Sequence, residues 1–340
     1  MKLNKTPEID AFMNRCLNNL ANEHKNDFIG LKISPVSEYD IQCQLKRCGF
    51  AEFNGSRDSW PSLYISTEMF LKSPYHQQVD LQLIKDPQFR YTRETIRAHE
   101  LFNIDAIQPD YHRELNDWMK LRALDQSYET IVLWQKHKVW MIDAPSEAKT
   151  IDPYAAKAAG DVLTFGLGIG YFIFMAMRNP QVKSLTVIEN SSEVIALFQK
   201  YLLPQFAGNT PLKIVCGDAY DYFNSEYMKR FDYVFVDIWQ SNQDGLTCIE
   251  RMLESYNPPI EQVDFWIEDS CLEIMPALIF GYFYQLIHPS KRLFKFHRRI
   301  QKKIKEYFDQ DNMLISQVGQ LKELMYSRTI QRRILALPHK

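Results

Sequence analysis

Short apolar runs alternate with amphipathic stretches over much of this chain. The apolar runs occupy residues 161–165, 185–188, 212–215, 231–236 and 263–267. Stretches with helical spacing of apolar residues separate them, at residues 171–178, 192–203, 220–223 and 245–256. Strands that alternate with helices form right-handed crossovers in a parallel sheet. The pattern therefore predicts an α/β fold with a doubly wound, mostly parallel sheet.

Glycines, acids and one alanine stand directly after these strands, where a ligand would lie. They are Gly166, Gly168, Gly170, Glu189, Asp218, Ala219, Asp237 and Glu268. Sheets of this kind bind ligands outside the carboxyl ends of their strands. We therefore expect these residues to line one edge of the sheet.

The spacing of the three glycines narrows the class of ligand. They follow a G-x-G-x-G pattern, whereas a dinucleotide site has G-x-G-x-x-G. The third glycine of that pattern would stand where this chain has Tyr171. Glycine lets the backbone approach a ligand where a Cβ would collide. Glu189, at the tip of the second strand, can accept hydrogen bonds from ribose hydroxyls. The layout favours a ligand such as S-adenosylmethionine over a dinucleotide.

Four motifs, in this order, resemble the class I S-adenosylmethionine-dependent methyltransferase family. They are V-L-T-F-G-L-G-I-G, V-I-E-N, C-G-D-A-Y-D-Y-F and F-D-Y-V-F-V-D-I-W, within residues 129–290. The nearest branch is that of the aminopropyltransferases, spermidine synthase and its relatives. The resemblance implies a Rossmann-like core in which the three glycines face the methionine part of the cofactor. It also implies that Glu189 holds the ribose, and that Asp218 and Ala219 meet the adenine. Acids at strand ends also serve as helix N-caps, and this is the alternative role for Glu189 and Asp218.

Two positions depart from the aminopropyltransferase pattern. Those enzymes carry an acid within the glycine turn, where this chain has Ile169, and a second acid where it has Gln240. The two acids hold and deprotonate a cationic polyamine, so aminopropyl transfer is not expected here. The N-P-P-Y-type motif of other amino-group methyltransferases is absent as well, since residues 237–240 read D-I-W-Q. The sequence thus indicates a cofactor and leaves the methyl acceptor open.

Candidate catalytic residues follow from the chemistry of methyl transfer. An amine acceptor needs a carboxylate that can hold it and take its proton. Asp237, at the tip of the fourth strand, is the first candidate, and Glu147 is the second. The candidates for binding the acceptor are Glu268, Tyr154 and Trp239. Three acids around one cleft, Asp237, Glu147 and Glu268, favour a cationic acceptor such as an amine or a guanidine. The alternatives are a solvated loop position for Glu147 and simple packing for Tyr154 and Trp239.

The remaining residues predict a three-part organisation. Residues 1–128 indicate a mostly helical accessory domain, and residues 129–290 the cofactor-binding domain. Within the latter, residues 129–143 predict a β-hairpin and residues 160–290 the core. Residues 291–340 form a C-terminal tail. In the accessory domain, helical patterns lie at residues 7–23, 92–101 and 109–124.

Residues 290–306 predict a basic amphipathic helix that extends into the C-terminal tail. Its cations could contact RNA, an anionic membrane surface or an acidic partner. They could equally be solvated, with their aliphatic stems covering the core. Further along, residues 331–337 are consistent with a closing strand.

Composition limits these alternatives. The net charge of the 340-residue chain is −2, which argues against general polyanion binding. No apolar stretch approaches the length of a membrane span, and no signal peptide is recognisable, so a cytoplasmic protein is expected. The six cysteines form no C-x-x-C pair, which favours buried free thiols over disulfides or a metal site.

Three functions remain open from the sequence. The first is a methyltransferase acting on a small molecule or a peptide. The second is a methyltransferase that modifies RNA or another macromolecule by means of the basic helix. The third is a protein that binds a nucleoside without transfer chemistry, since one fold serves many functions.

Overall fold

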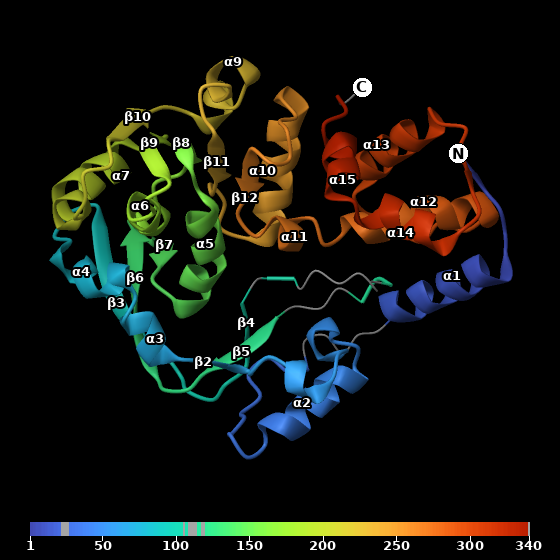
Figure 1. The fold of residues 1–340 in the computed structure, drawn as a ribbon, viewed down its shortest axis with the longest axis horizontal. Coiled ribbons are helices and arrows are strands. Elements are labelled where there is room, and N and C mark those ends of the chain that lie inside the picture. The colour runs from blue at the N-terminus through green and yellow to red at the C-terminus, as the bar shows by residue number, and fades with distance from the viewer. Residues whose placement is uncertain (22–26, 105, 108–113, 117–119, 339–340) are drawn as a thin grey trace.

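Five parallel strands form the central sheet of the computed structural model, which describes residues 1–21, 27–104, 106–107, 114–116 and 120–338 (Figure 1). In spatial order the strands are β10 (Leu212–Cys216), β9 (Val182–Glu189), β8 (Gly160–Phe165), β11 (Tyr233–Val236) and β12 (Val263–Phe265). All four pairings are parallel. The predicted α/β fold with a parallel sheet is confirmed.

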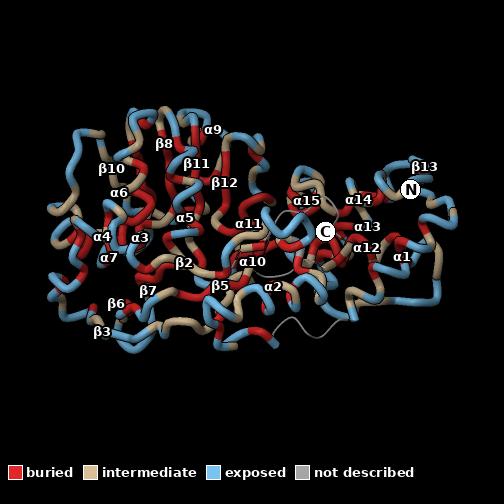
Figure 2. The backbone as a smooth tube through the Cα atoms, turned by 60° about the horizontal axis from the view of Figure 1, so that its bottom comes forward, coloured by how far each residue is buried: buried red, intermediate tan, exposed pale blue. Residues whose placement is uncertain are grey.

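Helices cover both faces of this sheet, so its strands are buried on two sides (Figure 2). Consecutive residues of β11 point to opposite faces, as the pleat requires. Tyr233 and Phe235 join one hydrophobic cluster, and Val234 and Val236 join the other. Burial on both faces explains why the strands read as continuous apolar runs. The helices from the hairpin to β12 are α5 (Pro145–Lys157), α6 (Tyr171–Met177), α7 (Ser192–Leu197), α8 (Ala219–Tyr222), α9 (Ser225–Met228) and α10 (Asn242–Ser255).

The N-terminal region contains more strand than the sequence predicted. β3 (Phe89–Ile96) occupies the first half of the helix expected at residues 92–101, and it pairs antiparallel with β6 (Tyr128–Gln135) along its whole length. Its aromatic and β-branched residues suit that pairing, which outweighs a weak helical pattern. β5 (Leu121–Leu124) occupies the end of the helix expected at residues 109–124, of which residues 109–113 and 117–119 lie outside the described part.

A hairpin of β6 and β7 (Lys138–Ile142) connects this region to the core. A second small sheet joins β5 to β2 (Tyr64–Ile65) and β4 (Phe102–Asn103). The helices of the region are α2 (Glu38–Arg47), α3 (Thr67–Leu71) and α4 (Pro74–Gln78). The expectation of a mostly helical region is therefore wrong for residues 89–96 and 121–124, and the domain boundaries stay a prediction.

The two ends of the chain meet in a helical layer beside the sheet (Figure 1). β1 (Lys2–Leu3) pairs with β13 (Leu314–Ile315), and α1 (Pro7–Leu20) shares a hydrophobic cluster with the C-terminal helices. Those helices are α11 (Glu268–Cys271), α12 (Met275–Ile287), α13 (Arg298–Asp309), α14 (Val318–Tyr326) and α15 (Arg328–Leu335).

Two expectations for the C-terminal tail are corrected here. The basic helix starts only at Arg298, where α13 begins, rather than near residue 290. Residues 331–335 lie in α15 and not in a strand, because Ser327 caps this helix and its apolar face is buried. The burial of Ile334 and Leu335 on one helical face explains the apolar pattern that resembled a strand.

All six cysteines are free thiols, but the predicted burial holds for only two of them. Cys43, Cys48 and Cys248 are partly exposed. Cys16 and Cys271 are buried, whereas Cys216 is exposed because β10 is an edge strand. The described residues include no cluster of three or more His, Cys, Asp or Glu side chains suited to a metal ion. Nor does any described helix combine the length and apolar character needed to cross a membrane.

A buried ion pair attaches α15 to the sheet. The guanidinium of Arg332 donates to Glu268 from Nε (2.7 Å) and from Nη2 (2.6 Å), and Nη2 also donates to the carbonyl of Val263 (3.0 Å). Both side chains are almost fully buried. When one partner of such a buried pair is removed, the other keeps an unpaired buried charge, which destabilises the folded state.

We expect Arg332→Ala to lower the free energy of unfolding by about 3–5 kcal/mol, because Glu268 then remains buried without its main partner. Urea denaturation followed by circular dichroism measures the change. Arg333→Ala, at the exposed neighbouring position, is the matched control and should stay within about 0.5 kcal/mol of the wild type. A loss below about 1 kcal/mol for Arg332→Ala would contradict a structural role for the pair.

Candidate functional site

The candidate site lies at the carboxyl edge of the sheet, where the strand order reverses. From β8 the chain adds β9 and β10 on one side, then crosses to place β11 and β12 on the other. Such a reversal leaves a crevice outside the carboxyl ends of the two central strands. The loop at residues 166–170 follows β8, and Asp237 follows β11, so both lie at this point.

Gly166 brings the ends of β8 and β11 into direct contact. A Cβ at this position would lie 2.0 Å from the carbonyl oxygen of Asp237, and the backbone φ is +96°. On the other side, the N–H of Asp237 donates to the carbonyl of Phe165 (3.0 Å). Only glycine satisfies both the approach and the left-handed conformation.

The next two glycines differ from each other in their surroundings. At Gly170 (φ +77°) a Cβ would lie 2.5 Å from the ring of Phe198, so this position is closed by packing. At Gly168 (φ +50°) it would meet only Met141 of β7, whose methyl carbon is 3.4 Å away. In the described part of the chain, the N–H groups of Gly168 and Ile169 have no acceptor. The loop thus offers two free backbone donors, and they lie beside the hairpin.

Glu189 holds the glycine loop from the neighbouring strand. Its Oε2 accepts from the N–H of Leu167 (3.1 Å), and its Oε1 accepts from the N–H of Ser191 (2.8 Å). Burial raises the pKa of this carboxyl group above its ordinary value. The N-cap of α7 is Ser191, so Glu189 does not serve as the helix cap. Each carboxylate oxygen keeps lone-pair capacity for a further donor.

Asp218 takes the alternative role that the sequence left open. Its Oδ1 accepts from the N–H of Tyr220 (3.0 Å), which makes it the N-cap of α8. The side chain is exposed, while the following Ala219 is buried. Capping uses only one carboxylate oxygen, so contact with a ligand stays a prediction.

Asp237 differs from the other acids at this edge because its carboxylate is unpaired. It is half-buried and accepts no hydrogen bond from the residues that the structure describes. Burial raises its pKa from 3.8 to about 7. A carboxyl group that is desolvated and has no compensating partner is a candidate functional group.

Two of the predicted acceptor-binding residues are engaged in the core instead. Glu268 is neutralised by Arg332, and the Nε of Arg328 is 3.5 Å from its carboxylate. Trp239 is buried against Phe265, with 6.3 Å between ring centroids, and its indole Nε1 finds no acceptor among the described residues. Trp239 therefore packs in the core, which was the alternative to a role in acceptor binding.

Glu147 and Tyr154 both belong to α5. Glu147 is half-buried in the first turn, and its N–H donates to the carbonyl of Ala144 (3.0 Å). Two turns later, the ring of Tyr154 lies 5.1 Å from that of Phe235 in β11, and burial raises the pKa of its hydroxyl. Tyr154 therefore packs on the sheet, as the alternative for this residue proposed, and the role of Glu147 stays a prediction.

A buried polar network on the N-terminal side of the glycine loop was missed by the sequence analysis. The hydroxyl of Tyr75, in α4, donates to the carbonyl of Ile169 (2.8 Å), and that of Tyr171 donates to Asp152 (2.7 Å). Beside them, His76 Nε2 lies 2.8 Å from Asp143 Oδ1. These partners are distant in sequence and form no motif, so no local pattern indicates the network.

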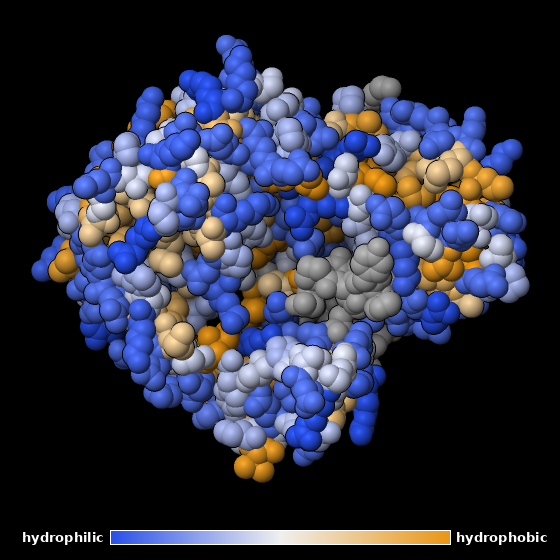
Figure 3. All heavy atoms as spheres, in the orientation of Figure 1, coloured by the Kyte–Doolittle hydropathy of each residue, from blue (hydrophilic) through white to orange (hydrophobic). Residues whose placement is uncertain are grey.

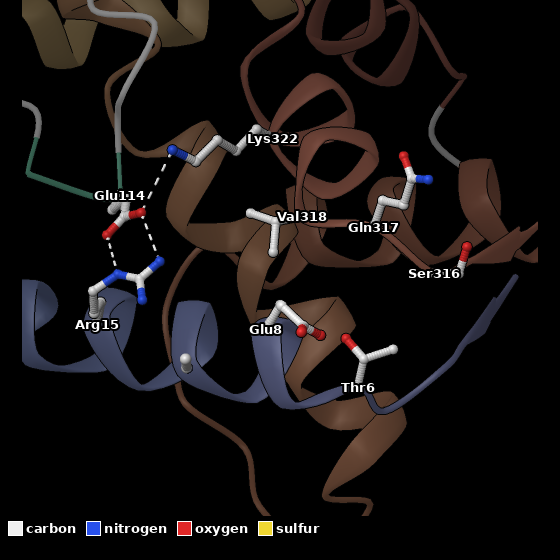
Figure 4. Close-up of a pocket in the computed structure, with 9 residues that line it drawn as sticks. Thr6, Glu8, Arg15, Glu114, Ser316, Gln317, Val318 and Lys322 are labelled. Carbon is white, nitrogen blue, oxygen red and sulfur yellow. Dashed lines mark hydrogen bonds and ion pairs between the residues drawn. The ribbon is translucent and has the colours of Figure 1, made fainter.

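A cavity elsewhere in the molecule does not overlap this edge. It lies between α1 and α14, where Glu114 accepts from Arg15 (2.7 Å) and faces Lys322 (3.5 Å) (Figure 4). Glu8 also lines this cavity, so its two acids balance its two cations and it presents little net charge to a ligand.

We expect Gly166→Ala to lower the melting temperature strongly, because the new methyl group would collide with the carbonyl of Asp237. A loss of several kcal/mol is reasonable for a backbone clash combined with positive φ. Gly319→Ala is the control, since this helical glycine has open space around its Cβ position and should gain about 0.5–1 kcal/mol. Equal melting temperatures for the two variants would contradict the close approach of β8 and β11.

No protein-family model matches the chain, and no curated protein does. Among solved structures, it is similar to a SAM-dependent methyltransferase from Agrobacterium tumefaciens (14% identity, 40% of this chain and 46% of that one, TM-score 0.28). It is also similar to spermidine synthase from Thermotoga maritima (14%, 44% and 60%, 0.28) and to an O-methyltransferase from Bacillus cereus (17%, 34% and 53%, 0.23). The chain covers less than two thirds of each of these proteins. Likenesses of this size assign no function.

Proposed function

We propose that this chain is an S-adenosylmethionine-dependent methyltransferase whose acceptor is an amine or a guanidine on a small molecule or peptide. The observation that carries the proposal is the unpaired carboxylate of Asp237 beside a glycine loop with two free N–H donors. The carboxylate of Asp237, which can bind a cation and accept a proton, thus lies next to the glycine loop at residues 166–170. The order of the motifs along the chain supports the same reading.

The residues present fit the cofactor in three places. The free N–H groups of Gly168 and Ile169 can hold a carboxylate, and the remaining lone pairs of Glu189 can hold ribose hydroxyls. Asp218 and Ala219, after the third strand, are the candidates for the adenine. When bound, S-adenosylmethionine supplies an electrophilic methyl group for an in-line displacement.

Asp237 acts on the acceptor in this proposal. With a pKa of about 7 it is ionised in roughly half of the molecules near neutral pH, which suits a group that both attracts a cation and takes up its proton. Glu147 is the second candidate for holding the acceptor. Glu268 is left out, because its carboxylate is neutralised by Arg332.

Cofactor binding tests the first half of the proposal. By isothermal titration calorimetry we expect micromolar affinity for S-adenosylmethionine and S-adenosylhomocysteine, and at least about a tenfold loss for Glu189→Ala, which removes the ribose acceptor. Glu193→Ala, at an exposed position of α7, is the matched control and should bind as the wild type does. Circular dichroism of each variant separates loss of binding from loss of fold. If neither ligand binds to the folded wild type, the proposal that this chain is an S-adenosylmethionine-dependent methyltransferase is rejected.

The raised pKa of Asp237 gives the second test. A raised pKa means that the folded state binds more protons than the unfolded state between pH 3.8 and about 7, so stability falls as pH rises through this window. Asp237→Asn removes the buried charge and should raise the free energy of unfolding at about pH 8 by ~1–3 kcal/mol. Transfer to amine and guanidine acceptors should rise through about pH 7 in the wild type and fall about 100-fold in the variant.

Asp221→Asn is the control for this test, since Asp221 is an exposed acid of α8 at the same edge. It should change neither stability nor turnover. Asp237→Asn that loses stability and keeps its turnover would contradict the catalytic assignment. Cofactor binding without any methyl transfer would instead favour the third function, a protein that binds a nucleoside.

A further inference from the structure

A groove with an apolar floor and a basic rim lies between α12 and α13, outside the candidate site. Its volume is about 470 Å³. Gly281 of α12 allows the ring of Phe294 to close the floor, because a Cβ there would lie 3.0 Å from that ring. The apolar floor comprises Leu278, Leu286, Leu293, Phe294 and Ile304, and the cations of the rim are Arg292, Arg298, Lys302 and Lys305. Figure 3 shows apolar surface next to polar surface on this side of the molecule.

Some of the cations in this segment are neutralised by the protein itself. Arg299 and Lys303 both pair with Glu250 and Glu254 on α10. Lys305 pairs with Asp309 in the next turn. The pairs of Arg299 and Lys303 hold α13 on α10, whereas the pair of Lys305 lies within α13. Together they neutralise part of the basic character of this helix.

Three other cations of the segment have no counterion among the described residues. Arg292, Lys295 and Arg298 are exposed, and none has an ion pair with a residue in the described ranges. Arg292 instead donates from Nη2 to the neutral side chain of Gln301 (3.2 Å), which orients its guanidinium without cancelling its charge. Three cations therefore concentrate positive potential within a few residues of each other, on a molecule whose net charge is −2.

An exposed aromatic ring stands among these cations. Phe296 is 51% exposed, and its ring lies 5.5 Å from that of Phe294 and 5.4 Å from that of His297. Aromatic rings that alternate with Lys and Arg are typical of surfaces that stack bases and bind the phosphates between them. Phe296 precedes α13, so an exposed ring and unpaired cations occur together in the segment that leads into this helix.

We propose that this groove, with Arg292 and Arg298 at its rim and Lys295 and Phe296 in the segment between them, binds a single-stranded nucleic acid. Phosphates contact the three unneutralised cations, and a base stacks on Phe296. The concave shape favours a flexible polyanion over a flat bilayer, and the exposed ring favours a nucleic acid over an acidic peptide. The inference does not depend on the proposed methyl transfer.

Fluorescence anisotropy with a short labelled oligouridylate tests this inference on the full chain. The triple variant Arg292→Gln/Lys295→Gln/Arg298→Gln should lose at least about tenfold in affinity, and its salt dependence should flatten by about 2 in log–log slope, since each contact contributes ~0.7. Phe296→Ala should lose about five- to a hundredfold with little change in the slope, because stacking is not ionic.

The matched control removes equal charge from another face. Lys183→Gln/Lys213→Gln/Lys229→Gln replaces three exposed lysines of the sheet domain and should bind as the wild type does. Asp237→Asn should also bind normally, which keeps this test separate from that of methyl transfer. The inference is overturned if the oligonucleotide does not bind, if both triple variants lose affinity equally, or if only vesicles containing phosphatidylglycerol bind.

Discussion

The contact between Gly166 and the carbonyl of Asp237 is the constraint on which the site depends. It draws together the ends of two strands whose loops carry the cofactor and acceptor candidates. Two further contacts fix the same loop, from Glu189 to the N–H of Leu167 and from Tyr75 to the carbonyl of Ile169. Three contacts therefore fix the position of this loop. The N–H groups of Gly168 and Ile169 remain as backbone donors that a ligand could use.

Acids at the ends of the strands differ in function because they differ in partners. Glu268 is neutralised by Arg332, and Asp218 uses one carboxylate oxygen to cap α8. Asp237 has no such partner, and its burial is a cost that the fold carries. Uncompensated groups of this kind are expected where function outweighs stability. Position at a strand end therefore identifies a candidate, and the hydrogen bonds of each carboxylate distinguish one candidate from another.

The parts that the sequence predicted are those specified by local pattern. The apolar runs gave the strands of the parallel sheet, and the glycine spacing located the loop at residues 166–170. Long-range pairing could not be predicted in the same way. Strand β3 follows from its pairing with β6, and the hydrogen bond of Tyr75 spans 94 positions of the chain. The neutralisation of Glu268 likewise depends on a residue 64 positions later, which no local pattern indicates.

The pairing of β1 with β13 has a consequence for the order of events during translation. Lys2 cannot find its partner Leu314 until the ribosome has added more than three hundred residues. At about 5–20 residues per second this delay is roughly 15–60 s. Throughout that time the apolar face of α1, with Ile9 and Phe12, has no C-terminal helices to cover it. The apolar face of α1 in a nascent chain therefore stays without this cover until the C-terminal helices have been synthesised.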